Sequence, residues 1–152
     1  MVWGPIRSAM GFARDRRGGT AVEFALLAPV LILLLAGLVD GSRLIVATMQ
    51  VKAAAQAGAD YARRNGFDAT GIQGAVVSGT SLAVAAMPAP AQQAACVSGM
   101  TITPTVQQTC PGGSVAGSFV TVSAQAPFSA IMPWPGLSSP STVSAQSLVR
   151  LQ

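Results

Sequence analysis

The chain has 152 residues, of which 51% are hydrophobic and only 9% are charged, and it contains no histidine. Its net charge of +4 is concentrated in residues 1–18, and no basic residues are interleaved with aromatic ones as in a nucleic-acid-binding face. The few acidic residues are not paired at a catalytic spacing, and two cysteines without histidine fall short of a metal ligand set. The composition therefore argues against nucleic-acid binding, a metal or other cofactor, a small-molecule substrate and enzymatic activity.

Residues 1–18 have no repeating apolar face and are rich in arginine. This pattern is typical of a leader on the cytoplasmic side of a membrane. The run from Thr20 to Val39 is long enough to span the hydrocarbon core, which requires about 20 apolar residues in a helix. We therefore expect a cytoplasmic leader over 1–18 and a transmembrane segment over 19–43, with later residues outside. A cleaved secretory signal is the alternative, but the run is long for one and Leu38–Ser42 offers no small-x-small site.

The helical pattern continues beyond the apolar run to about residue 64. This stretch is alanine-rich and free of proline, and Asn65-Gly66 is a stop signal. One face of it is apolar at spacings of three and four residues, and its members are Leu44, Ala47, Val51, Ala54, Gly58 and Tyr61. The sequence predicts one helix over about 20–64, whose second half packs on a folded domain.

The remainder of the chain predicts a second helix followed by strands. The second helix begins at Asp68 or Thr70 and ends before Pro88 and Pro90. β-branched and alternating residues predict strands, and these lie at 101–103, 118–123 and 141–151, with a turn at 111–113 and a proline-punctuated connection at 127–140. Residues 44–152 are therefore expected to form an extracytoplasmic α+β domain with a small antiparallel sheet, and the whole chain a pilin-like fold.

The two cysteines, Cys96 and Cys110, both fall in the part expected outside the membrane. Because that compartment is oxidising, a disulfide between them is the natural interpretation. Two unpaired small apolar residues are the alternative.

The start of the apolar run carries a recognisable motif. Gly18 is followed by four residues and then by Glu23-Phe24, which resembles the G-xxxx-E-[FY] site of Tad-type pilins and pseudopilins. The Phe24–Pro29 run, the alanine-rich outer helix and the C-terminal strand, proline-rich turn and strand resemble those of TadE-like proteins of the tight-adherence (Flp) pilus machinery.

This resemblance implies a minor pseudopilin of the bacterial inner membrane that acts structurally in pilus biogenesis and adhesion. A prepilin peptidase would recognise Gly18, Gly19, Glu23 and Phe24 and cut after Gly18, which makes Glu23 the fifth mature residue. By resemblance, Glu23 would pair with the N-terminal amine of a neighbouring pilin-like subunit during assembly. Two alternatives stay open: Glu23 lies shallowly at the cytoplasmic interface, and the chain is an unprocessed single-pass anchor that presents an envelope binding domain.

Overall fold

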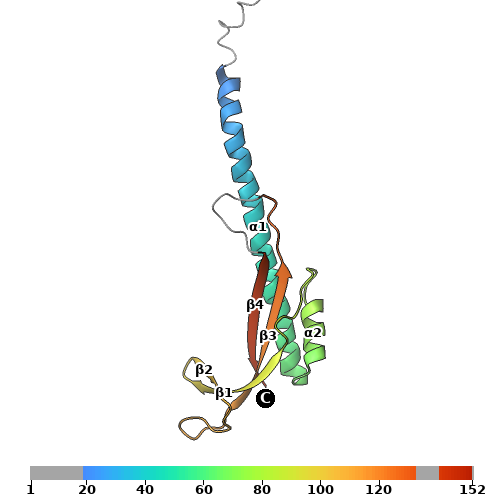
Figure 1. The fold of residues 1–152 in the computed structure, drawn as a ribbon, viewed down its shortest axis with the longest axis vertical. Helices are drawn as coiled ribbons and strands as arrows, with labels where there is room; N and C mark the ends of the chain where they lie inside the picture. Colours follow the sequence, from blue (N-terminus) through green and yellow to red (C-terminus); the bar gives the residue numbers. More distant parts are fainter. Residues whose placement is uncertain (1–18, 133–140, 152) are drawn as a thin grey trace, which may run out of the picture. The chain divides into compact units, whose positions relative to one another are not determined.

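The computed structural model describes residues 19–132 and 141–151. Its elements, in chain order, are α1 (Gly19–Asn65), α2 (Ala69–Ser78), β1 (Ala91–Ser98), β2 (Thr101–Pro104), β3 (Gly117–Pro127) and β4 (Thr142–Arg150) (Figure 1). The chain divides into two compact units, Met1–Val39 and Asp40–Gln152. A long apolar N-terminal helix, a second helix and a four-stranded antiparallel sheet confirm the expected α+β, pilin-like arrangement.

The first unit contains the apolar part of α1. None of the residues 19–39 is buried, and the most apolar 18-residue stretch of this helix has a mean hydropathy of 2.6. Pro29 lies inside the helix without ending it, as membrane helices tolerate. By its length and composition, α1 is able to cross a membrane.

The second unit is built on the remaining part of α1, which buries one side, while Ile45, Val46 and Met49 stay exposed. Small residues dominate the buried positions, which are Val51, Ala54, Ala55, Gly58, Ala59 and Ala62. Leu44, Ala47 and Tyr61 are half-buried and pack against this core. The expected apolar face is thus confirmed, and its small side chains allow neighbouring elements to approach the helix closely.

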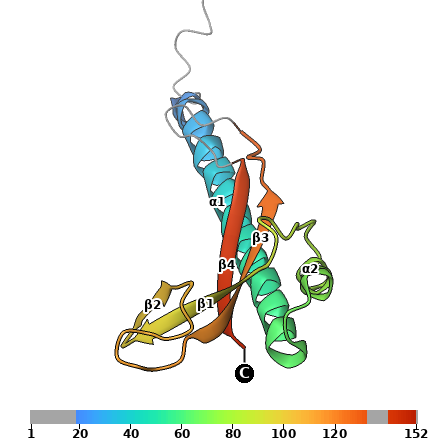
Figure 2. The same ribbon diagram turned by 60° about the horizontal axis from the view of Figure 1, so that its bottom comes forward.

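The sheet has the strand order β2-β1-β3-β4, and every neighbouring pair is antiparallel. Strands β3 and β4 run along the second half of α1, and the sheet curls toward β1 and β2 (Figures 1 and 2). The central strand β3 supplies the sheet's main contribution to the core, with Val120, Val122, Ala124 and Ala126 buried at alternate positions.

Helix α2 begins where the sequence predicts but is shorter than expected. Asp68 is its N-cap, and the Asp68 carboxylate accepts a hydrogen bond of 3.1 Å from the Thr70 amide. The helix ends at Ser78, so its extension toward Pro88 is wrong. The following residues are held extended instead, because Ala85 exchanges two backbone hydrogen bonds of 2.8 Å with Gln125 of β3.

Strand β1 is absent from the sequence-based expectation. Its residues, AQQAACVS, include few with high β-propensity, so local preference does not reveal it. The strand forms because it pairs with β2 on one side and with β3 on the other. The predicted strands at 101–103, 118–123 and 141–151 are confirmed as β2, β3 and β4 with shifted ends, and residues 133–140 of the expected proline-rich connection lie outside the described residues.

Gly58 marks the closest approach within the core. A Cβ at this position would lie 2.6 Å from Val76 Cγ2 on α2 and 2.8 Å from Val122 Cγ1 on β3. Both α2 and β3 therefore contact α1 at Gly58, where there is space for a hydrogen atom but not for a methyl group.

We predict that Gly58→Ala destabilises the second unit by about 1–2 kcal/mol, because overpacking outweighs the gain in helix propensity. Gly74→Ala in α2 is the matched control, since nothing lies within 4 Å of a Cβ there. It should leave stability unchanged or raise it slightly. Pulse proteolysis in urea on the full chain in mild detergent measures both. Equal stability of the two variants would contradict the packing described at Gly58.

Candidate processing and assembly site

The motif residues lie at the N-terminal end of α1. Gly19 is the first residue of the helix, and Glu23 and Phe24 follow one turn later with exposed side chains. Residues four apart share a helix face, so Glu23 lies on the same side as the Gly19 backbone nitrogen. Gly18, the other half of the expected cleavage site, lies outside the described residues.

Glu23 is chemically isolated on this helix. It is the only charged residue between Arg17 and Asp40 in the sequence, and within the described residues it makes no ion pair. Its apolar surroundings are exposed, including Val22 at 62% and Leu26 at 73%. A charged side chain costs about 2.5–3.5 kcal/mol on insertion scales at the centre of a membrane helix, and Glu23 lies toward one end of the run. Glu23 is therefore available to a partner and would gain from one.

A second carboxylate, which the sequence analysis did not single out, lies at the other end of the apolar run. Asp40 is buried and accepts hydrogen bonds from the Ile131 amide, at 2.9 and 3.2 Å from its two oxygens, and from the Met132 amide at 3.3 Å. Arg43 lies 3.4 Å away as its ion-pair partner. Burial of this charge is offset because backbone and guanidinium donors both reach it.

Arg43 also bridges to the chain that leaves β3. Its guanidinium donates to the Ser129 carbonyl at 3.5 Å and lies 5.9 Å from the centre of the Phe128 ring. The i,i+3 spacing of Asp40 and Arg43 was visible in the sequence. The loop that they hold is some ninety positions away along the chain, so no local pattern could reveal the contact.

The disulfide between Cys96 and Cys110 is present, with a Cα–Cα distance of 5.6 Å. It joins β1 to the loop that follows β2, and so closes the hairpin at its base. Because disulfides persist in oxidising compartments, the bond supports an extracytoplasmic location for this unit.

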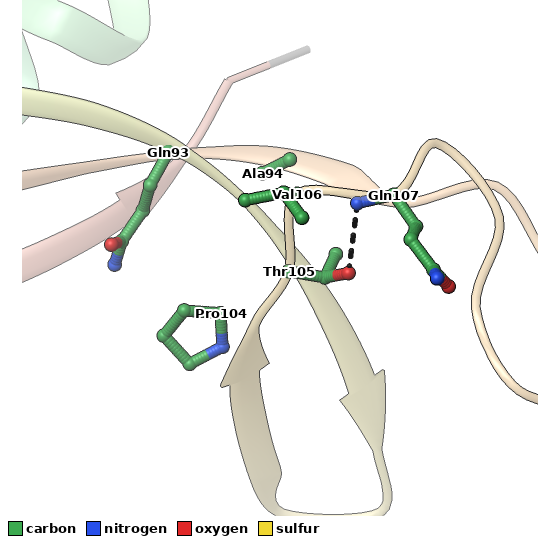
Figure 3. Close-up of a pocket in the computed structure, with 6 residues that line it drawn as sticks. All are labelled: Gln93, Ala94, Pro104, Thr105, Val106 and Gln107. Atoms are coloured by element: carbon green, nitrogen blue, oxygen red, sulfur yellow. Dashed lines mark hydrogen bonds between the residues drawn. The ribbon is translucent and has the colours of Figure 1, made fainter.

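A shallow recess of about 470 Å³ lies beside this hairpin (Figure 3). It is lined by Gln93, Ala94, Pro104, Thr105, Val106 and Gln107, none of which is titratable. Thr105 Oγ1 accepts a hydrogen bond of 3.0 Å from the Gln107 amide (Figure 3). This bond stabilises the loop and does not position a reactive group. Nowhere in residues 19–132 or 141–151 do three histidine, cysteine or acidic side chains gather as a metal site would require. The described residues thus offer surfaces for contact and no arrangement for acid–base or metal chemistry.

A long apolar N-terminal helix that by length and composition is able to cross a membrane, followed by a disulfide-bonded α+β unit, is a pilin-like arrangement. Residues 18–60 match the family model of TadE-like protein, which confirms the TadE-like resemblance over the helix and its motif. No curated protein and no solved structure matches the chain. The match covers less than half of the chain, so it is a likeness over α1 and its N-terminal motif.

Proposed function

We propose that the chain is a minor pseudopilin of a Tad/Flp pilus system in the bacterial inner membrane. A prepilin peptidase removes residues 1–18, and the mature chain begins at Gly19. Helix α1 anchors it through residues 19–43, with the domain of residues 44–152 in the periplasm or at the cell exterior. Its function is structural: it joins other pilin-like subunits and the Tad machinery in pilus biogenesis and adhesion.

The observation that carries this proposal is the exposed Glu23 on an otherwise uncharged helical segment that matches a TadE-like family model. Removal of the leader creates a free amine on Gly19. In lipid, an unpaired charge is unfavourable both on that amine and on Glu23. When the amine of one subunit pairs with the Glu23 of its neighbour, both costs fall. The carboxylate thereby favours association of subunits over isolated insertion.

An unprocessed single-pass anchor that presents a binding domain is the alternative function. The same helix and the same disulfide-stapled unit would serve it equally well. Cleavage of the leader separates the two, because only the pseudopilin requires a new N-terminus next to Glu23.

We predict that the mature protein begins at Gly19 in cells with a working prepilin peptidase. Cleavage there, and not one residue later, makes Glu23 the fifth residue. Intact-mass analysis of the membrane-extracted protein measures this directly, and cells without the peptidase provide the control. Retention of Met1 in both strains would favour the unprocessed anchor.

We predict that Glu23→Gln separates anchoring from assembly. The variant keeps the size of the side chain and loses the charge, so membrane insertion should be unharmed and leader cleavage should persist. Assembly should fail, because the neighbouring amine is left buried without its partner. Surface pilus counts and co-purification of pilin-like subunits, at equal expression levels, measure the effect.

The control is Asp60→Asn, which also removes one carboxylate but from an exposed ion pair with Arg63. Exposed pairs of this kind contribute little to stability, so piliation should be normal. Normal piliation with Glu23→Gln as well would show that Glu23 is an interfacial residue with no part in assembly.

A further inference from the structure

The start of the connection from β3 to β4 is tied to the end of the apolar run. Asp40 binds the backbone amides of Ile131 and Met132, and Arg43 reaches the Ser129 carbonyl and the Phe128 ring. These contacts hold residues 128–132 beside the first turn of α1 that follows Val39.

The height of this turn relative to a bilayer follows from the length of the apolar run. The segment from Thr20 to Val39 has 20 residues, and as a helix it is about 30 Å long, which equals the thickness of the hydrocarbon core. If it fills that core, Asp40 lies at the boundary with the outer headgroup layer. Residues in hydrogen-bond contact with Asp40 then lie within the headgroup layer themselves.

The surface presented there is suited to that layer. We define the interfacial loop surface as Arg43, Phe128 and Ile131. The Ile131 side chain is 63% exposed, although its backbone is fixed by Asp40, and the Arg43 side chain is 46% exposed. An exposed aliphatic group, an aromatic ring and a cation at one level are the combination found at membrane–water interfaces, where apolar parts enter the lipid and charged ends stay hydrated.

A hollow of about 350 Å³ continues this surface along the helix. Its walls combine apolar and polar groups with a single cation, and its lining residues are Ser42, Arg43, Val46, Ala47, Gln50, Leu82, Pro127, Phe128 and Ser129. Such a lining suits the glycerol and phosphate region of a phospholipid, for which a guanidinium is a strong hydrogen-bond donor.

We propose that the interfacial loop surface is a second membrane contact, which rests on the outer phospholipid headgroup layer with Ile131 inserted and Arg43 at the phosphates. Asp40 is the positioning residue, because it holds the loop backbone at that level. This inference depends on α1 crossing the bilayer as proposed above. Its consequence is that the domain contacts the membrane surface at a second place besides α1.

Fluorescence quenching in vesicles of phosphatidylethanolamine and phosphatidylglycerol tests the proposal on the full chain. Single cysteines (Leu31→Cys, Ile131→Cys and Val77→Cys) are labelled with an environment-sensitive dye without reduction, so that the native disulfide stays closed. Leu31 reports on the span. Val77 on α2 is 55% exposed and reports on a surface near Gly58, eighteen residues along α1 from Asp40.

We expect quenching by a headgroup-level spin-labelled lipid and a blue-shifted emission at Ile131. At Val77 we expect quenching by aqueous iodide alone. Deep lipid quenching at Leu31 with purely aqueous behaviour at Ile131 would overturn the loop contact while leaving the anchor intact. Aqueous behaviour at Leu31 would instead overturn the span on which both proposals depend.

The role of Asp40 is tested with Asp40→Asn in the Ile131-labelled protein, because the amide group brings donor hydrogens toward the two backbone donors. The Ile131 signal should then shift toward the aqueous one. Asp60→Asn is the matched control. Asp60 forms the same i,i+3 pair with an arginine, but its side chain is 58% exposed and it contacts no loop backbone among the described residues. Protease resistance of the labelled variant confirms that the domain is folded. An unchanged Ile131 signal in folded Asp40→Asn protein would overturn the positioning role.

Discussion

Helix α1 must be stable in two different surroundings, and the rest of the structure depends on how its sequence divides between them. Up to Val39 it is apolar on every side and none of its side chains is buried within the protein. From Asp40 onward, one side of the helix is buried, and most of the apolar residues buried there are alanine or glycine. The small side chains bring α2 and β3 into contact with the helix at Gly58, so the element that carries the proposed anchor also supplies the core of the domain.

Two acidic residues of this helix, Glu23 and Asp40, lie in contrasting surroundings. Glu23 stands alone within the apolar run and is exposed, which suits a contact that forms only when subunits associate. Asp40 ends the same run but is buried, and its hydrogen bonds are satisfied within its own unit. Asp40 is thus bound within its own chain, whereas Glu23 is proposed to bind a neighbouring subunit. The sequence alone does not distinguish these roles, because each is a single acidic residue in or next to the apolar segment.

The sequence revealed the features that depend on neighbouring residues. The extent of α1, the N-cap at Asp68 and the three strands rich in valine and threonine all follow from local preference and periodicity. The cysteine pairing followed from the expected compartment and is confirmed. Strand β1 and the early end of α2 depend on pairing with β3. The Asp40 contact depends on a loop about ninety residues away. None of these three features could be predicted from a local pattern. Within the candidate site, the placement of Glu23 and Phe24 on α1 was predictable, whereas the cleavage itself remains a prediction.

The central claim is that α1 places the disulfide-stapled unit on the outer side of the inner membrane. Treatment of intact spheroplasts with a membrane-impermeant maleimide, with and without prior reduction, followed by mass spectrometry of the peptides that contain Cys96 and Cys110, tests it most directly. The account predicts that neither thiol is modified before reduction and that both are modified after it, without permeabilisation of the membrane. Free thiols that react only after the membrane is permeabilised would place the domain in the cytoplasm and contradict the account.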